Sequence, residues 1–190
     1  MAQSKDEQRR AALARRDALT TAQRAGAAQA LAEQGLPFDL APGEVVSGYM
    51  PIRSEIDPRP LMQALAGRGA RLALPVVVAR DQPLVFRQWM PQAPLIRGGL
   101  DILEPSAEAP ACDPQIVLVP LAAFDRAGHR IGYGAGHYDR TLARLCSRGP
   151  VVTVGLAFSV QQVDRVPALP HDIALDYIAT EHEIIETRSH

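Results

Sequence analysis

Three glycines alternate along a short segment that also carries basic and acidic side chains. Gly132, Gly134 and Gly136 follow Arg130, and Asp139 comes three residues after the last glycine. Glycine lets the backbone approach an anion closely and adopt positive φ values. The unsatisfied amides at the start of a following helix bind phosphate well, and a carboxylate beside phosphate supplies an oxygen ligand for Mg²⁺. The segment therefore predicts a phosphate site with an associated magnesium ion.

The glycine spacing matches neither of the two common nucleotide-binding fingerprints. G-x-G-x-G lacks the G-K-[S/T] ending of a P-loop and differs from the dinucleotide pattern G-x-G-x-x-G. On the glycines alone, a tight connection between a strand and a helix is as good an interpretation as an anion site. The neighbouring Arg130, Tyr138 and Asp139 favour the phosphate site.

The elements expected on either side of this loop place it where α/β proteins bind ligands. Residues 116–119 (IVLV) form an apolar run that suits a central strand buried on both faces. A helix is expected over residues 137–146. Ligands of open α/β sheets bind at the carboxyl ends of the strands, and the loop would lie at such an end.

The rest of the chain alternates strand and helix patterns, which indicates an α/β fold with a largely parallel sheet. Further strands are expected at residues 44–50, 71–78, 84–89, 151–158 and 176–180, the second and third of these forming a hairpin. Further helices are expected at residues 5–19, from 20 or 21 to 35, and at 58–68. Residues 91–112 are expected to form loops with one short strand. We expect a single domain over residues 1–190, with a helical segment 1–35 packed on an α/β core 44–190.

The first helix carries a basic stripe. Ser4 and Glu7 form a capping-box pattern that predicts where this helix begins. Lys5 and Arg9 lie one helical turn apart, and Arg16 falls near the same stripe. From the residues alone, such a stripe is more typical of a solvated helix face than of a site. Lys5 is nevertheless the one lysine among 20 basic residues.

The composition argues against several classes of function. A net charge of −1 and 5% aromatic residues do not suit a protein built to bind nucleic acid. No apolar run reaches the roughly 18 residues of a membrane span, and the charged start MAQSKDEQRR is unlike a secretory signal. Cys112 and Cys146 show no metal or redox spacing and are most simply reduced thiols. We expect a cytoplasmic monomer with small-molecule partners, although the composition leaves the oligomeric state open.

The segment from Pro120 to Arg140 (PLAAFDRAGHRIGYGAGHYDR) resembles the signature of the 5-formyltetrahydrofolate cyclo-ligases, also called 5,10-methenyltetrahydrofolate synthetases. That signature is P-x-x-A-F-D-x-x-G-x-R-[LI]-G-x-G-x-G-[YF]-Y-D-[RK]. His137 departs from it at a position where an aromatic residue is usual, and Ala135 stands at a position that varies. Other stretches that resemble the family follow in the same order: K-x-x-x-R at residues 5–9, a glutamate loop at 47–57, GLDILEP at 99–105, G-x-A-F at 155–158, and V-P…H-D at 166–172.

The resemblance implies a fold and a reaction. The fold would be a three-layer α/β/α sandwich with a mostly parallel sheet, as in sugar-phosphate isomerases and CoA transferases, with the N-terminal helices packed on it. The reaction would convert a reduced folate, 5-formyltetrahydrofolate, to 5,10-methenyltetrahydrofolate with ATP and Mg²⁺ as cofactors. The formyl oxygen would attack the γ-phosphate, and N10 would then close the ring as phosphate leaves.

The resemblance also implies roles for individual residues. Lys5 and Arg130 would be catalytic. The nucleotide would be bound by two segments, namely Lys5, Asp6, Glu7, Gln8 and Arg9, and Arg130, Ile131, Gly132, Tyr133, Gly134, Ala135, Gly136, His137 and Tyr138. The folate would be bound by Met50, Glu55, Tyr133, Gly134, Ala135, Gly136 and His137, and Mg²⁺ by Asp139 and Asp172.

Three of these positions also have a purely structural interpretation. Met50 fits a core residue at a strand end, and Glu55 fits a solvated loop glutamate. Asp172 lies in a proline-rich loop and fits a turn or a helix cap.

Two other functions stay open from the sequence. One is a family member that binds a folate or a nucleotide without turnover. The other, by analogy of fold alone, is a sugar-phosphate isomerase. The combination of Lys5, Arg9, Glu55 and Asp139 argues against both.

Overall fold

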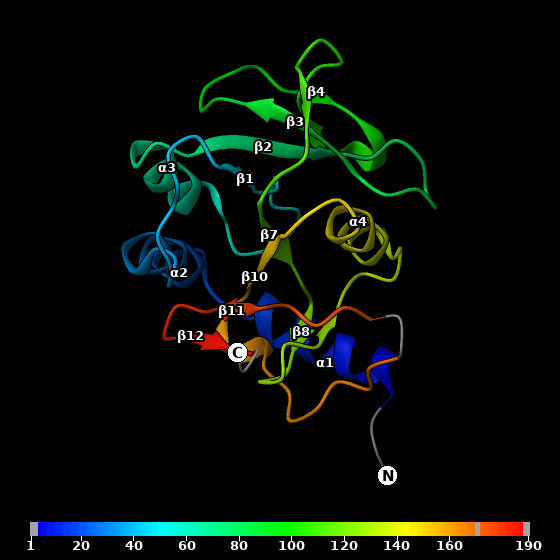
Figure 1. Ribbon diagram of the computed structural model, residues 1–190. Coiled ribbons are helices and arrows are strands. Elements are labelled where there is room, and N and C mark those ends of the chain that lie inside the picture. The colour runs from blue at the N-terminus through cyan, green and yellow to red at the C-terminus, as the bar shows by residue number, and fades with distance from the viewer. Residues whose placement is uncertain (1–3, 170–171, 188–190) are drawn as a thin grey trace.

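The computed structural model describes residues 4–169 and 172–187, and its centre is a mixed β-sheet of eight strands (Figure 1). The strands of this sheet lie in the order β12-β11-β10-β7-β1-β2-β3-β6. Two small antiparallel pairs, β4 with β5 and β8 with β9, lie outside it. In chain order the strands are β1 (Val45–Ser47), β2 (Arg71–Val76), β3 (Val85–Trp89), β4 (Ile96–Arg97), β5 (Leu103–Glu104), β6 (Ala111–Cys112), β7 (Ile116–Pro120), β8 (Ala123–Phe124), β9 (Arg130–Ile131), β10 (Val152–Leu156), β11 (Tyr177–Ala179) and β12 (Ile184–Glu186).

The central strands of the sheet are parallel, and antiparallel strands flank them at both edges. β11, β10, β7, β1 and β2 pair in parallel, whereas β12, β3 and β6 join antiparallel. The central strand β7 is buried along residues 116–119, which explains its uninterrupted apolar sequence. The predicted α/β fold with a mostly parallel sheet is confirmed.

Helices cover both faces of the sheet and give three layers (Figure 1). On one face, Leu31 and Leu65 pack in one core with Leu118 of β7. On the other face, Leu142 packs in a second core with Val117, the neighbouring residue of the same strand. Successive side chains of a strand point to opposite faces, so β7 contributes to both cores. The helices are α1 (Lys5–Asp17), α2 (Thr21–Gln34), α3 (Arg59–Gly67) and α4 (His137–Cys146), with 3-10 turns η1 (Gly99–Asp101) and η2 (Ser159–Gln161).

The first helix, α1, lies beside the small β8–β9 pair and apart from α2 and α3 (Figure 1). Its start is the predicted capping box, in which Ser4 Oγ accepts from the Glu7 amide and the Glu7 carboxylate accepts from the Ser4 amide. Ala12 is fully buried in a small core with Ala123 and Ile131. This packing holds the basic stripe of α1 next to the glycine-rich loop, which begins directly after β9.

The predicted strand at residues 176–180 is confirmed as β11, and a further strand that was not predicted, β12, follows it and pairs with it antiparallel. Residues 91–112 hold three short strands instead of one, since β4 pairs with β5 and β6 pairs with β3. Strands of two or three residues are too short to leave a periodic pattern in a sequence. The predicted hairpin is confirmed by the antiparallel register of β2 and β3.

Across the described part of the chain, no helix combines the length and the apolar character that crossing a membrane requires.

Candidate active site

A cavity of about 370 Å³ opens at the carboxyl ends of the central parallel strands. Met50 lies just beyond β1, Val77 follows β2, and Pro120 ends β7. The glycine-rich loop also lies at this edge, where an α/β sheet is expected to bind its ligand. The predicted site residues that line the cavity are Lys5, Arg9, Met50, Glu55, every residue from Arg130 to Asp139, and Asp172.

The glycine-rich loop turns sharply into α4. Gly134 and Gly136 have φ values of +97° and +66°, which side chains other than glycine rarely adopt. Gly136 is the N-cap residue of α4, and no side chain caps the first turn of this helix. The amides of that turn therefore keep the donor character that favours an anion. A Cβ atom on Gly132 or Gly134 would meet nothing within 4 Å, so the backbone there borders open space.

Two cations and two carboxylates form pairs at one end of the cavity. Arg130 donates from Nη2 to Asp139 Oδ1 at 2.6 Å and from Nη1 to the Ile173 carbonyl at 2.6 Å. Lys5 Nζ donates to Asp172 Oδ2 at 2.5 Å. The Arg130 guanidinium therefore joins the helix that carries Asp139 to the segment that carries Asp172. Only 6% of the Arg130 side chain is exposed, so its charge depends on these partners.

The first helix contacts the glycine-rich loop directly. Arg9 Nε donates to the Gly132 carbonyl at 2.8 Å, and Arg9 Nη1 forms an ion pair with Asp6. The other predicted nucleotide ligands of α1 do not line the cavity. Glu7 caps the helix, and Gln8 Nε2 donates to the Arg165 carbonyl at 2.9 Å. For Asp6, Glu7 and Gln8 a role toward the nucleotide stays a prediction.

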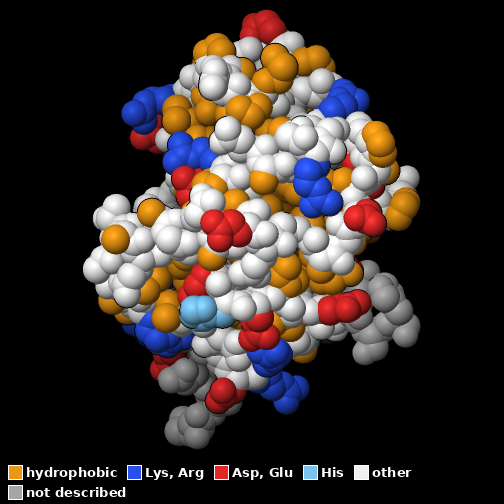
Figure 2. All heavy atoms as spheres, turned by 90° about the vertical axis from the view of Figure 1, so that its left-hand side faces the viewer, with side chains coloured by type: hydrophobic (Ala, Val, Ile, Leu, Met, Phe, Trp, Pro, Cys, Tyr) orange, Lys and Arg blue, Asp and Glu red, His pale blue; other side chains and the backbone are white. Residues whose placement is uncertain are grey.

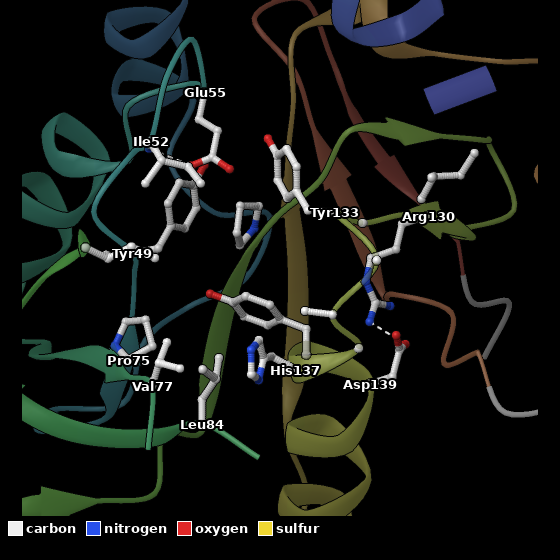
Figure 3. Close-up of a pocket in the computed structure, with 18 of the residues that line it drawn as sticks. Tyr49, Ile52, Glu55, Pro75, Val77, Leu84, Arg130, Tyr133, His137 and Asp139 are labelled. Carbon is white, nitrogen blue, oxygen red and sulfur yellow. Dashed lines mark hydrogen bonds and ion pairs between the residues drawn. The ribbon is translucent and has the colours of Figure 1, made fainter. Parts of the chain in front are cut away.

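A buried glutamate lies at the other end of the cavity. Figure 3 shows Glu55 and Ile52 on one side, Arg130 and Asp139 on the other, and Tyr133 between them, its hydroxyl pointing toward Glu55. Glu55 is 8% exposed, and its Oε2 accepts from the Ile52 amide at 2.9 Å. Burial raises the pKa of Glu55 above its ordinary value, although hydrogen bonds from Ile52 and Tyr133 lower it in part. The interpretation of Glu55 as a solvated loop residue was wrong.

Behind Tyr133 lies Arg16, which reaches the site from the last turn of α1. Its guanidinium donates from Nη1 to the Tyr133 hydroxyl at 2.5 Å and from Nε to Ser54 Oγ at 2.9 Å. Arg16 is 1% exposed and does not line the cavity. The helical spacing placed it near the basic stripe of α1, and the structure places it under the residues that surround Glu55. Its positive charge is a further cause that lowers the pKa of Glu55.

His137 lines the cavity with one ring nitrogen satisfied and one without a partner. Nδ1 lies 3.0 Å from the Gln82 carbonyl oxygen, which can only accept, so Nδ1 carries the hydrogen. Nε2 is buried and has no hydrogen-bond partner among the described residues.

Several lining residues gave no signal in the sequence. They are mostly apolar residues that follow strands or lie in loops, and such residues look like ordinary core or turn positions. Their location at the carboxyl ends of β1 and β2 is the one signal that could have suggested some of them. These residues are Tyr49, Ile52, Pro75, Val77, Leu84, Ile102, Leu103 and Leu169.

The two predicted metal ligands fit a magnesium ion that is bound together with phosphate. Asp139 and Asp172 both line the cavity beside the cations. The described residues contain no group of three or more His, Cys, Asp and Glu side chains that could hold a metal ion by themselves. Mg²⁺ commonly takes one or two protein carboxylates and completes its shell with phosphate oxygens and water. Two carboxylates are therefore a sufficient protein contribution.

The fold and the cavity are those of an α/β enzyme with a glycine-rich loop at the carboxyl edge of its sheet. The model of the 5-formyltetrahydrofolate cyclo-ligase family matches residues 1–181, and the chain belongs to this family. It is 35% identical to the 5-formyltetrahydrofolate cyclo-ligase of Mycolicibacterium smegmatis, over 93% of both chains. It is 31% identical to the Escherichia coli protein of the same name, over 90% of this chain and 97% of the relative.

Two solved structures have the same fold. The NMR structure of 5,10-methenyltetrahydrofolate synthetase from Aquifex aeolicus superimposes with a TM-score of 0.79 at 29% identity, covering 98% of this chain and 94% of that one. The Mycoplasma pneumoniae 5,10-methenyltetrahydrofolate synthetase superimposes with a TM-score of 0.73 at 23% identity, covering 94% and 99%. Because the Mycoplasma pneumoniae protein is only 23% identical to this chain, its similarity supports the shared fold alone.

Proposed function

We propose that the chain converts 5-formyltetrahydrofolate to 5,10-methenyltetrahydrofolate in a reaction that needs ATP and Mg²⁺ and releases ADP and phosphate. Membership of the cyclo-ligase family supports the reaction class. The observation that carries the cofactor requirement is the two-ended cavity. A buried acceptor, Glu55, lies at one end, and two cation–carboxylate pairs with a glycine-rich loop lie at the other.

The phosphate end is organised to exchange its internal ion pairs for contacts with a ligand. Arg130 and Lys5 now neutralise Asp139 and Asp172. When a magnesium–nucleotide complex arrives, the carboxylates can turn to the metal and the cations to the phosphate oxygens. Each buried charge then keeps a partner, which avoids the cost of an uncompensated ion. Mg²⁺ held by Asp139 and Asp172 would neutralise charge on the phosphates.

The folate end is organised to hold a flat group that donates paired hydrogen bonds. An ionised Glu55 can accept two N–H bonds from the 2-amino-pyrimidinone edge of a pterin. Tyr133 and Arg16 favour the ionised form of Glu55 against the effect of burial. Met50 and Ile52 supply apolar surface beside this acceptor.

The chemistry explains why the two ends share one cavity. A formyl group bound to N5 resembles an amide, so it is a poor electrophile and its oxygen is a poor leaving group. Transfer of the γ-phosphate to that oxygen corrects both defects, and N10 can then attack the formyl carbon while phosphate leaves. Arg130 and Lys5 would stabilise the charge on the transferred group, and the loop between Gly132 and Gly136 would align it.

The reaction can be tested directly by mixing the chain with 5-formyltetrahydrofolate, ATP and Mg²⁺ and following the absorbance of the methenyl product. We expect product only when ATP and Mg²⁺ are both present, with one ADP formed for each methenyl group. A folded sample that gives no ATP-dependent product would refute the proposal. ATP hydrolysis that is independent of folate would point to a different phosphoryl acceptor.

A further inference from the structure

Arg140 is a basic residue of α4 that turns back onto the glycine-rich loop. Basic side chains are scattered over the α2–α3 side of the molecule (Figure 2), but Arg140 has a specific target. Its Nη2 donates to the Ala135 carbonyl at 2.5 Å, and the Arg80 carbonyl oxygen lies 3.3 Å from the same nitrogen. Every residue from Arg130 to Asp139 lines the cavity, whereas Arg140 does not. Its guanidinium therefore lies behind the loop as seen from the cavity.

The hydrogen bond from Arg140 fixes the direction of one peptide group in the loop. In a planar trans peptide, the carbonyl of one residue and the N–H of the next point in opposite directions. The Ala135 carbonyl faces Arg140, so the Gly136 N–H points away from the guanidinium. This N–H makes no hydrogen bond within the part of the chain that the structure describes. Because Gly136 lines the cavity, its amide is free to bind a ligand there.

The backbone at Gly136 also brings several amides together. Gly136 has the left-handed conformation, with φ 66° and ψ 12°, and His137 begins the right-handed helix α4. Successive residues of opposite hand turn their amides toward a common point, which makes a concavity for an anion. The amides of Gly136, His137 and Tyr138 can therefore act together on one phosphate group. A reversed peptide between residues 135 and 136 would replace the first of these donors by a carbonyl oxygen, which repels an anion.

Gly136 and Arg140 also fit each other sterically. A Cβ atom on Gly136 would lie 2.8 Å from Arg140 Nη1. The guanidinium thus occupies the space that a side chain at position 136 would fill. Together with the hydrogen bond to Ala135, this close packing restricts the peptide between residues 135 and 136 to one orientation.

We propose that Arg140 is a positioning residue for phosphate binding. It holds the peptide between Ala135 and Gly136 so that the N–H, and not the carbonyl oxygen, faces the phosphate groups. A guanidinium serves this purpose because its planar fork donates in fixed directions. The proposal rests on the proposed function, in which a nucleotide occupies this end of the cavity. Arg140 itself does not touch the nucleotide and acts through the Gly136 amide.

The kinetic test compares Arg140→Met with Arg144→Met in the full chain. Arg144 is a matched control, because it lies one turn further along α4 and its Nη2 donates to the Leu84 carbonyl at 3.1 Å. In both arginines Nε is buried without a partner among the described residues. We expect Arg140→Met to raise the KM for ATP about tenfold or more, the usual effect of losing one hydrogen bond to a charged group. The KM for 5-formyltetrahydrofolate should stay within about twofold, and Arg144→Met should leave both values nearly unchanged.

Arg140→Lys keeps a charged donor at this position and should restore part of the ATP affinity that Arg140→Met loses. If Arg140→Met does not fold, Arg140→Gln takes its place in every comparison. An equal rise in both KM values, or an equal rise of the KM for ATP in the Arg140 and Arg144 variants, would show a merely structural role and overturn the proposal.

A binding measurement separates failure of this proposal from failure of the proposed function. The amide resonance of Gly136 can be followed by ¹⁵N NMR as ADP and Mg²⁺ are added without folate. We expect it to shift in the unaltered chain and in Arg144→Met, and to shift much less in Arg140→Met at saturating ADP. An equal shift in Arg140→Met, or none in the unaltered chain, would overturn the proposal. A shift that Arg140→Met abolishes, in a chain that forms no methenyl product, would refute the reaction and support the role of Arg140.

Discussion

The Arg16 guanidinium lies 2.5 Å from the Tyr133 hydroxyl and holds it beside Glu55. A residue from the last turn of α1 thereby supports the folate end of the cavity, while Lys5 and Arg9 from the first turns of the same helix contact the phosphate end. One helix therefore touches both halves of the proposed reaction.

We predict that Arg16→Gln moves the acid limb of the pH profile for kcat/KM of the folate to higher pH. Glu55 must be ionised to accept from a pterin, so affinity falls as pH falls through its raised pKa. Removing Arg16 removes one of the causes that lower this pKa, which therefore rises further. The profile should be measured at saturating ATP.

Arg15→Gln is the control for that profile, because Arg15 donates to the Val160 and Gln162 carbonyls, away from Glu55. Arg16→Gln is also expected to cost roughly 1–3 kcal/mol of stability through buried groups left without partners. A destabilised variant whose acid limb coincides with that of the Arg15 variant would show that Arg16 has a structural role only.

Glu55→Gln is predicted to raise the unfolding midpoint at neutral pH while abolishing folate binding. The folded chain holds the pKa of Glu55 above the ordinary value of 4.5, chiefly by burial. Glu55 therefore contributes stability that is fully present below its pKa in the unfolded chain and is lost as pH rises through its higher pKa in the folded chain. Glutamine has a similar size and no charge, so the variant does not lose this stability as pH rises. Thermal unfolding should show a higher midpoint for Glu55→Gln than for the unaltered chain at neutral pH, and no such difference below pH 4.5. An equal difference in midpoint at both pH values would contradict this origin.

Asp139→Asn should raise the Mg²⁺ concentration needed for half-maximal turnover by about tenfold or more, which corresponds to ~1.4 kcal/mol. The amide keeps the size of the side chain but loses the charge that serves a metal and pairs with Arg130. Magnesium titrations of turnover at fixed ATP measure the effect, with Asp101→Asn as a control, since Asp101 is exposed in η1 and pairs with Arg97. An unchanged magnesium curve would remove Asp139 from the metal site.

Gly134→Ala and Gly132→Ala should differ although both add one methyl group to the same loop. Neither methyl would meet an atom within 4 Å, but only Gly134 has a positive φ, of +97°. Gly134→Ala is expected to cost about 1–2 kcal/mol through backbone strain and to raise the KM for ATP. Denaturant unfolding of the two variants tests this, and equal losses would mean that strain is not what requires glycine at 134.

Lys5→Arg should lower ATP affinity or turnover several-fold. The ammonium group of Lys5 meets Asp172 as a compact point charge, and a planar guanidinium has a different shape and donor geometry. Initial rates over a range of ATP concentrations test this. If the variant keeps both parameters, a lysine at this position has no particular significance.

The sequence predicted the parts of the site that are continuous along the chain. The run from β7 through the glycine-rich loop into α4 follows from local patterns, because an apolar strand, three glycines and a helix start are each visible without knowledge of the fold. Glu55 could be placed only by resemblance, since its burial depends on Tyr133 and Ile52 closing around it. No local pattern reports on such contacts.

The remaining features could not be predicted because they arise from tertiary packing. The spacing of Arg16 gives its helical face but not what covers that face, so its burial beneath Tyr133 could not be predicted. The short strands β4, β5, β6 and β12 exist through their pairing partners. Two or three residues are too few for their own propensities to decide the structure.

The pairing of Lys5 with Asp172 has a practical consequence for covalent labelling. Because Lys5 is the only lysine in the sequence, an acylating reagent finds a single side-chain amine, and that amine lies on the wall of the cavity. Phosphate groups that cover it should protect it from the reagent. The mass of one peptide would then report whether this end of the cavity is filled, for any nucleotide and in the absence of turnover.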